Sequence, residues 1–236
     1  MRIDKFLANT GYGSRKDVKV LLMKKQVFVN GSIVKNSALH INPYEDMIKV
    51  NDTLIKYRKY IYMMMNKPPQ VISATEDKRD KTVIDLLPPA LQNFQPFPVG
   101  RLDKDTEGLL LITNDGKLAH HLLSPKKNID KTYYAKIDGI ITENDITSFR
   151  NGIQLNDGYV TKPAGLSILH RGEISEVLVT ITEGKFHQVK RMFHAIDKQV
   201  IYLKRMQMGR LKLDQSLALG EYRELTEEEL QLLNNP

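Results

Sequence analysis

The excess positive charge of this chain lies entirely in its first quarter, and this asymmetry constrains how the chain is divided. Residues 1–59 hold 12 Lys and Arg against 5 Asp and Glu, whereas residues 60–236 hold 23 of each kind. A module that binds a polyanion, joined to a neutral body, would give this pattern. A solvated basic face would give it as well, so the charge alone does not separate the two.

The first segment has the pattern of a helix followed by a hairpin. Ser14, with Asp17 three residues later, matches the capping box that starts a helix. The Asn-Gly pair at positions 30 and 31 is a strong signal for a type I′ turn, and it predicts a hairpin over residues 26–34. Three cations fall within about 100° of arc on one face of the predicted helix: Arg15, Lys16 and Lys19.

A polar bridge at residues 56–59 predicts a boundary between a first domain, 1–58, and a second, 59–236. Beyond the bridge, strand and helix patterns alternate without a regular βαβ rhythm. This favours an α+β fold with a mixed, mainly antiparallel sheet flanked by helices over a doubly wound one. The expected strands are residues 60–65, 109–112, 132–138 and 176–182, and the expected helices are 82–87, 186–196 and the segments capped by Thr142 with Asp145 and by Thr226 with Glu229.

The expected helix over residues 186–196 carries apolar side chains at helical spacing. Phe186, Val189, Phe193 and Ile196 would form one stripe facing the core.

The composition also bears on the compartment. The chain has no cysteine, which excludes disulfides, thiolate metal ligands and thiol nucleophiles. Its N-terminus lacks the apolar stretch of a signal peptide, and no apolar run approaches the length of a membrane span. We therefore expect a soluble, cytoplasmic protein with no membrane partner.

The N-terminal pattern resembles the S4 RNA-binding domain in residue types, order and spacing over residues 2–7, 14–16, 24–25 and 27–31. The resemblance implies a small N-terminal domain of the S4 (αL-type) fold that binds RNA. Clustered Arg and Lys on a rigid helix face neutralise phosphates without reading bases. The alternative is that these cations only solubilise the surface. The expected RNA contacts are Arg2, Lys5, Arg15, Lys16, Lys19 and Lys24.

A second pattern centres on residues 98–110, PVGRLDKDTEGLL, where a charged turn precedes an apolar run. On spacing alone it is only a turn before a buried strand. The segment resembles the central motif of pseudouridine synthases, in which Arg-Leu-Asp is followed three residues later by a hydroxyl residue, and then by Gly and an apolar strand. Other segments resemble the further motifs of the family in its order: 62–68, 131–135, 183–193, 203–205 and 220–225.

Together with the S4 pattern, the resemblance covers almost the entire chain, and it is to the small-subunit ribosomal pseudouridine synthase A branch. The chain departs from the family near Gln70, where the family usually has Gly. This departure concerns the geometry of the local loop rather than the chemistry.

The resemblance implies a role for each residue of the predicted site. Asp103 would be the catalytic carboxylate, acting on the sugar as nucleophile or base, and Lys190 would keep it ionised. Tyr133 would stack on uracil and take the proton from C5. The uridine must leave the RNA stack to react, and Arg101 would fill the vacated space or hold phosphate. Asp105 lacks the Arg-Leu context and is the less favoured carboxylate.

Two neighbours of these residues have secondary roles. Tyr134 should point to the opposite face of the strand from Tyr133. Thr106 is either a hydrogen-bonding group of the loop or an ordinary turn cap.

No cofactor is expected, because pseudouridine forms when the bond from ribose to N1 of uracil breaks and the ring rejoins through C5, without a redox step. No metal is expected either. His120 and His121 are adjacent, which suits shared ligation poorly, and His187 and His194 lack an evident third ligand.

The resemblance implies an RNA-modifying isomerase that acts on one uridine of small-subunit (16S) ribosomal RNA, as free RNA or in a small-subunit assembly intermediate. The chain ends soon after its last predicted helix, which favours this branch over sister enzymes that act on 23S rRNA and carry longer basic tails. A non-catalytic S4-type protein of ribosome biogenesis is the rival from another class. We expect a monomer.

Overall fold

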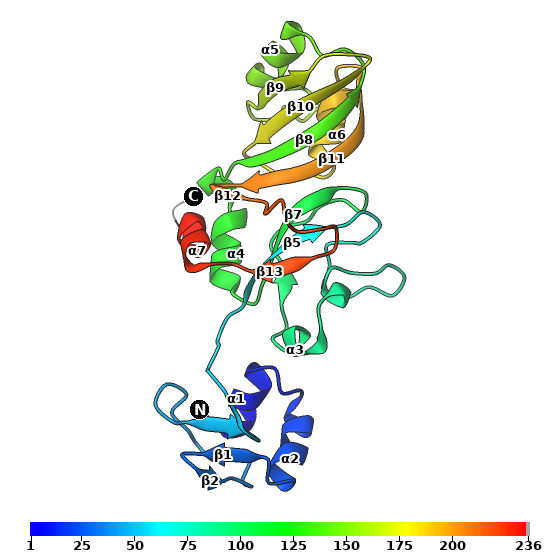
Figure 1. Ribbon diagram of the computed structural model, residues 1–236. Coiled ribbons are helices and arrows are strands. Elements are labelled where there is room, and N and C mark those ends of the chain that lie inside the picture. The colour runs from blue at the N-terminus through cyan, green and yellow to red at the C-terminus, as the bar shows by residue number, and fades with distance from the viewer. Residues whose placement is uncertain (235–236) are drawn as a thin grey trace. The chain divides into compact units, whose positions relative to one another are not determined.

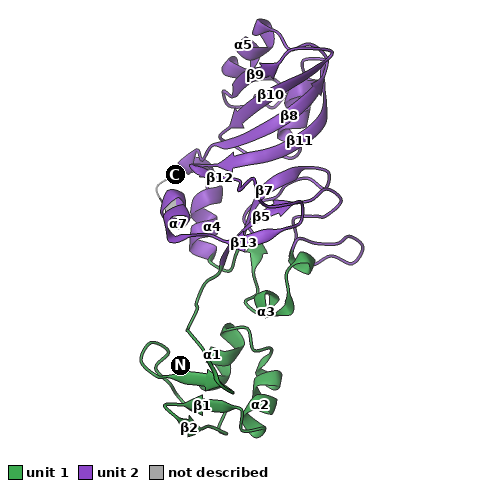
Figure 2. Ribbon diagram, in the orientation of Figure 1, with its two compact units in different colours: residues 1–61, 84–97, 113–115 green, residues 62–83, 98–112, 116–236 purple. Residues whose placement is uncertain are grey.

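The structure, a computed structural model, describes residues 1–234, and this part of the chain divides into two compact units (Figure 2). The first unit consists of residues 1–61, 84–97 and 113–115, and the second contains the rest. The boundary predicted between residues 58 and 59 falls in the segment that follows the last strand of the N-terminal sheet. Its place as a domain boundary stays a prediction.

The first unit begins with two helices, α1 (Ile3–Asn9) and α2 (Arg15–Met23). The predicted capping box starts α2: the Ser14 hydroxyl accepts from the Asp17 backbone N–H at 3.3 Å, and the Asp17 carboxylate accepts from the Ser14 N–H at 2.8 Å. This pair satisfies backbone donors that a helix start leaves free. The prediction of this helix is confirmed.

A four-stranded sheet follows in the described chain, in the order β2-β1-β3-β4. Asn30 and Gly31 have φ of 50° and 84° and join β1 to β2, as a type I′ turn requires, so the predicted hairpin is confirmed. Apolar residues from both helices and from β1 and β3 pack into one core. The strands are β1 (Val27–Val29), β2 (Ser32–Ile33), β3 (Ile48–Val50) and β4 (Thr53–Leu54).

The helix predicted over residues 82–87 is only a short 3₁₀ turn, η1 (Ile84–Leu86). Pro88 follows in an extended conformation and precedes a separate short helix, α3 (Pro89–Gln92). Proline disfavours helical geometry in the residue before it, which explains why the predicted helix does not continue through the Pro-Pro pair.

A second, larger sheet has nine strands within residues 1–234 (Figure 1). Its main path runs β13-β5-β7-β11-β8-β10-β9, with β12 on β11 and β6 on β7. The pairs of β8 with β10 and β11 are antiparallel, whereas β7 and β11 are parallel, so the expected mixed, mainly antiparallel α+β fold is confirmed. The strands are β5 (Tyr62–Lys67), β6 (Phe97–Pro98), β7 (Glu107–Thr113), β8 (Lys131–Asp138), β9 (Gly165–His170), β10 (Ile174–Ile181), β11 (Gln199–Met208), β12 (Leu211–Lys212) and β13 (Tyr222–Glu224).

Helices flank this sheet. The Thr142–Asp145 capping box is present at the start of α5, as predicted. Contacts place α5 against β9 and α6 against β11. No helix in the described residues is both long and apolar enough to cross a membrane. The helices are α4 (Gly116–Leu123), α5 (Glu143–Asn151), α6 (Gln188–His194) and α7 (Glu227–Asn234), with a 3₁₀ turn, η2 (Pro125–Lys127).

The helix predicted over residues 186–196 is shorter than expected, and part of its core stripe is wrong. Val189 and Phe193 are buried as expected, but Phe186 precedes α6 and is 68% exposed. His187 has φ of 49°, in the left-handed region, and this reversal of the backbone takes Phe186 off the helical face. The Phe186 ring stacks on His187 instead, at 3.8 Å between ring centroids.

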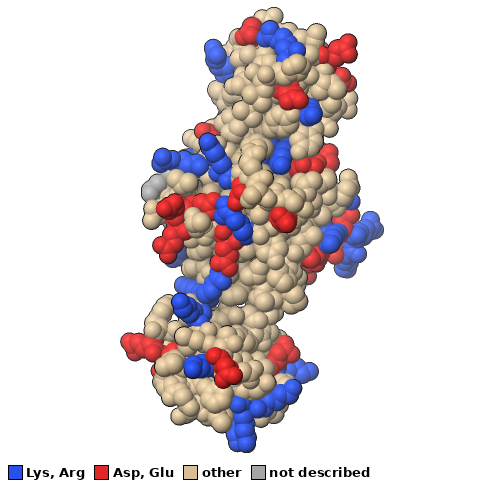
Figure 3. Space-filling model, in the orientation of Figure 1, with Lys and Arg blue, Asp and Glu red and all other residues tan. Residues whose placement is uncertain are grey.

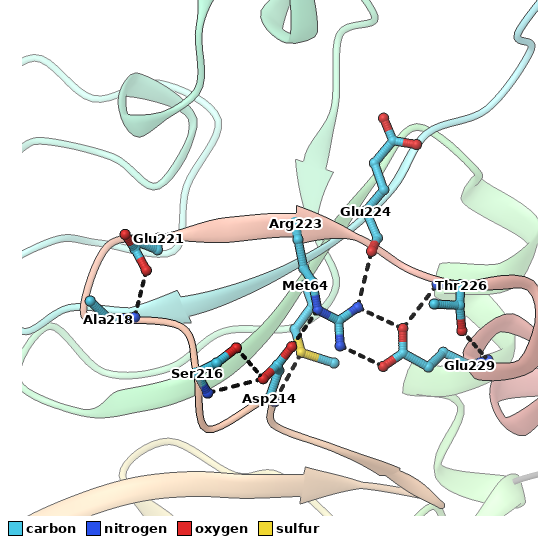
Figure 4. A network of polar contacts seen from close by, with 9 residues as sticks. All are labelled: Met64, Asp214, Ser216, Ala218, Glu221, Arg223, Glu224, Thr226 and Glu229. Carbon is cyan, nitrogen blue, oxygen red and sulfur yellow. Dashed lines mark hydrogen bonds and ion pairs between the residues drawn. The ribbon is translucent and has the colours of Figure 1, made fainter.

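Arg223 on β13 ties the C-terminal elements of the second unit together (Figure 4). Its guanidinium donates to Asp214 at 2.6 Å and to both oxygens of Glu229 at 2.7 Å. Glu229 also closes the predicted capping box of α7, because it accepts from the Thr226 N–H at 2.9 Å while its own N–H donates to the Thr226 hydroxyl. Hydrogen bonds from Ser216 and Arg223 lower the pKa of Asp214 to about 2.

Candidate active site

Asp103 lies in the loop between β6 and β7, and the backbone on either side of it is fixed. The Leu102 N–H donates to the Ser73 hydroxyl at 3.0 Å, and that hydroxyl donates to the Leu102 carbonyl at 3.1 Å. The Thr106 N–H donates to the Asp103 carbonyl at 3.1 Å. Leu102 and Thr106 are buried, so the loop is anchored on both sides of the carboxylate.

Lys67, at the end of β5, also contacts the loop that carries Asp103. It is fully buried, and its ammonium donates to the carbonyls of Pro68 and Thr106 at 2.9 Å. Burial lowers the pKa of Lys67 to about 8, although the charges of Asp105 and Asp103 oppose this shift. The motif at residues 62–68 contains this lysine, but nothing in the motif indicates that it is buried.

The turn at Gln70, where the resemblance leads us to expect Gly, has a conformation that favours Gly. Gln70 has φ of 64°, in the left-handed region, and its N–H donates to the Lys104 carbonyl at 2.7 Å. A residue with a Cβ adopts this conformation at a cost of about 1–2 kcal/mol, which Gly avoids. The chain thus keeps the turn, and its hydrogen bond to the Asp103 loop, with a less favourable residue.

The structure brings Lys190, from α6, to the Asp103 carboxylate. Its ammonium lies 3.3 Å from Asp103 Oδ2 and 2.5 Å from Asp105 Oδ1. The two carboxylates differ in exposure: the Asp103 side chain is 26% exposed and the Asp105 side chain 62%. Burial tends to raise the pKa of Asp105, but the hydrogen bond and charge of Lys190 outweigh it, so the pKa falls. Lys190 therefore serves both carboxylates, and Asp103 is the more enclosed one.

A cavity of about 70 Å³ opens at the Asp103 side chain. Arg101 lies at its edge, and Tyr133, on β8, also lines it. Tyr134 does not line this cavity and packs edge-to-face on Tyr202, so the predicted opposite orientation of the two tyrosines is confirmed. Of the predicted site residues, Arg101, Asp103 and Tyr133 thus line one cavity. Lys190 contacts Asp103 but does not line this cavity.

Thr106 also lines this cavity. Its hydroxyl is buried and has no hydrogen-bond partner in the part of the chain that the structure describes. A buried hydroxyl without a partner is costly, and a ligand in the cavity would supply one. The role of a hydrogen-bonding group, left open by the sequence, is therefore favoured over that of a turn cap.

Sequence reasoning missed His187 as part of the site. Its Nε2 lies 3.6 Å from Asp103 Oδ1, and the residue lines the same cavity. The loop that carries it is held by Gln188, which donates to the buried Glu183 at 2.7 Å and accepts from the Lys185 N–H at 2.8 Å. His187 lies within the sequence motif at 183–193, for which the resemblance implied a catalytic role only for Lys190.

No cluster of three or more His, Cys, Asp or Glu side chains that would hold a metal ion occurs within residues 1–234.

The six cations predicted to contact RNA on the S4 domain lie in the first unit, and all are exposed. Figure 3 shows Lys and Arg side chains gathered on the surface over the region of α2. One of the six is engaged within the protein: the Arg2 guanidinium donates to the buried Asp4 carboxylate at 2.6 Å. The six are Arg2, Lys5, Arg15, Lys16, Lys19 and Lys24.

The sequence matches two known families, one in each region. The RNA pseudouridylate synthase family matches residues 61–195, which hold Asp103, Tyr133 and Lys190, and the S4 domain matches residues 1–45. The class defined by this fold and site is that of enzymes that isomerise uridine in RNA. The chain belongs to the RNA pseudouridylate synthase family and carries an N-terminal S4 domain.

Relatives match over their full length. The RNA pseudouridine synthase YtzG of Bacillus subtilis is 53% identical over 100% of this chain and 99% of its own. The ribosomal small subunit pseudouridine synthase A of Escherichia coli K12 is 37% identical over 98% of each chain. A crystal structure of a pseudouridylate synthase superposes with a TM-score of 0.70, at 36% identity over 99% of both chains.

Proposed function

We propose that the protein converts one uridine of small-subunit (16S) ribosomal RNA to pseudouridine, with Asp103 as the catalytic nucleophile. The observation that carries the proposal is the contact of Asp103 with Lys190 at a cavity that Tyr133 also lines. The small-subunit substrate is supported by the names of full-length relatives, such as the ribosomal small subunit pseudouridine synthases A of Yersinia pestis and E. coli.

The proposed chemistry uses the Asp103 carboxylate, whose Oδ2 lies 3.3 Å from the Lys190 ammonium. Asp103, as the nucleophile, bonds to the nucleotide while the bond from C1′ of the ribose to N1 of uracil breaks, and the electron pair of that bond stays on the uracil ring. The ring turns, C5 uses an electron pair of the ring to bond C1′, and the bond to Asp103 is released. The proton on C5 then passes to the Tyr133 hydroxyl oxygen as that hydroxyl releases its own proton, and N1 gains a proton. Atoms and electrons balance within one nucleotide, so the proposal includes no cofactor and no metal.

The uridine reaches Asp103 only after it leaves the base stack, because the reacting atoms are covered in an RNA helix. Arg101 lines the Asp103 cavity and is exposed. It could therefore fill the space in the RNA stack that the base leaves, or bind the phosphate of that nucleotide. Tyr133, which is 8% exposed, offers its ring to the base inside the cavity.

The substrate is tested by mapping pseudouridines in all ribosomal RNA from cells with and without the gene. One position of 16S rRNA that loses its pseudouridine supports the proposal. A position lost from 23S rRNA instead would assign the protein to a sister activity. No lost position in either RNA would contradict a ribosomal RNA substrate.

The catalytic residue is tested with a matched pair of variants, Asp103→Asn and Asp105→Asn. Both carboxylates contact Lys190, so both substitutions remove one partner of the same cation. We expect Asp103→Asn to abolish pseudouridine formation with RNA affinity nearly unchanged, and Asp105→Asn to stay within about tenfold of wild type, a barrier change of about 1.4 kcal/mol. Asp103→Asn activity within that same range would refute the nucleophile assignment.

The proposal extends to a cytoplasmic protein that acts as a monomer on free 16S rRNA or on a small-subunit assembly intermediate. Comparing modification of naked transcript and of assembly intermediates, with the oligomeric state measured by light scattering, tests these points.

A further inference from the structure

A second and larger cavity, of about 310 Å³, adjoins the Asp103 cavity in the second unit. The two share part of their lining, including Arg101, Tyr133 and Lys185. A nucleotide chain with its uridine in the first cavity would therefore pass the second. We call the second one the cationic cavity because five cations line it: Arg101, Lys131, Lys162, Lys185 and Arg205.

The cations of this cavity lack anionic partners. Within residues 1–234, none of the five is in an ion pair with a carboxylate. Lys162 donates instead to the neutral Asn128 side chain at 2.8 Å, and Lys131 donates to the Ile129 carbonyl at 2.7 Å. Both hydrogen-bond acceptors are neutral, and only the more distant charges of Asp130 and Glu183 act on the Lys131 ammonium.

The one acidic residue that lines the cavity, Glu183, is already engaged. It accepts hydrogen bonds from the Tyr159 hydroxyl at 2.6 Å, the Lys162 N–H at 3.1 Å and the Gln188 amide at 2.7 Å. A single carboxylate with its oxygens occupied leaves an excess of positive charge around the cavity.

Arg205, on β11, gives the most specific sign of a missing anion. The residue is 2% exposed, and its Nε donates to the Leu109 carbonyl at 2.7 Å. Its Nη2 is buried and has no partner among the described residues. Burial and the neighbouring Arg205 charge lower the pKa of Lys131, so two like charges stand close together in a partly buried place. An anion would accept the hydrogen bond that Arg205 Nη2 has free, and it would reduce the repulsion between Arg205 and Lys131.

We propose that the cationic cavity binds a backbone phosphate of the substrate RNA next to the uridine that enters the Asp103 cavity. Arg and Lys are the residues that hold phosphate oxygens, and such contacts fix register without reading sequence. The cavity would thus position the uridine for Asp103. This inference rests on the proposed function, since it takes the substrate to be RNA.

The first test measures binding of the full chain to an unmodified 16S rRNA transcript over a series of salt concentrations. Lys162→Gln removes an exposed cation of the cavity, and Lys212→Gln removes an exposed cation on β12 that lines neither cavity. Lys162→Gln should weaken binding about tenfold and reduce the slope of log K against log salt by about 0.7, the loss of one phosphate contact. Lys212→Gln should leave both values at wild type. An unchanged slope for Lys162→Gln overturns the proposal.

The second test identifies the phosphate. A set of short RNAs that contain the target uridine is made. Each RNA has one neutral methylphosphonate in place of one phosphate on either side of that uridine. At one position the substitution should weaken binding to the wild-type protein about tenfold and have a clearly smaller effect on Lys162→Gln, in which part of the phosphate contact is already lost. If the two losses add at every position, the lysine and the flanking phosphates act independently, and the proposal is wrong.

Pseudouridine formation by the wild-type protein on the same RNA distinguishes a failure of the proposed function from a failure of the cavity assignment. If no pseudouridine forms, the proposed function fails, and the cavity assignment fails with it. If pseudouridine forms but Lys162→Gln keeps the wild-type slope, only the cavity assignment fails.

Discussion

The close approach of β7 and β11 at Gly108 provides a sharp test of how the site is assembled. Gly108 lies opposite Arg205 in the parallel pair, and it has φ of 103°. A Cβ added there would lie 2.3 Å from the Arg205 carbonyl oxygen and 2.7 Å from its nitrogen. Since both contacts are with backbone, Gly108→Ala relaxes only if β7 and β11 move apart.

The magnitude follows from two separate costs. An L-residue at positive φ loses about 1–2 kcal/mol relative to Gly, and forcing an extra group into a packed site costs about 1–3 kcal/mol more. Gly158→Ala isolates the first cost, because Gly158 has φ of 83° and nothing within 4 Å of its added Cβ. We therefore expect Gly108→Ala to be less stable than Gly158→Ala by about 1–3 kcal/mol.

Urea unfolding of the two variants measures this difference, and single-turnover pseudouridine formation measures its effect on the site. Asp103 lies just before β7, and Lys190 is on α6, which packs on β11. Because the two residues are carried by different strands of the pair, moving β7 away from β11 should also move Asp103 away from Lys190. Gly108→Ala should accordingly lose more activity than Gly158→Ala. Equal stability of the two variants would refute the argument that the backbone contact with Arg205 requires a glycine.

Two further predictions concern Lys67 and the S4 domain. Burial lowers the pKa of Lys67 from 10.5 to about 8, so the unfolded chain binds more protons than the folded one between these values. The free energy of unfolding should therefore rise by about 2 kcal/mol from pH 8 to pH 10 through this group. Lys67→Met should remove that rise in urea unfolding, and the same pH dependence in both proteins would contradict the prediction. On α2, Arg15→Ala and Lys19→Ala should each weaken RNA binding and reduce its salt slope by about one phosphate contact, whereas unchanged slopes would place the RNA elsewhere.

Local elements of the fold could be predicted because their causes lie within a few residues. The capping boxes at Ser14 and Thr142 and the hairpin turn at residues 30–31 each depend on hydrogen bonds or backbone angles between near neighbours. Strand β11 was not predicted, although it lies centrally in the sheet. Its buried Arg205 breaks the apolar alternation that would have marked it as a strand.

The sequence by itself determined the family, the S4 module and the identity of Asp103, Tyr133 and Lys190 as the candidate catalytic set. These residues are recognised by their place in ordered motifs, which needs no knowledge of distances. Only the tertiary structure decided which side chains meet. The parallel pairing of β7 with β11 and the packing of α6 bring Lys190 to Asp103 across 87 residues of chain, and they bury Arg205 beside the cationic cavity. Such contacts follow from strand register and burial, which depend on the packing of the whole sheet and not on any short stretch of sequence.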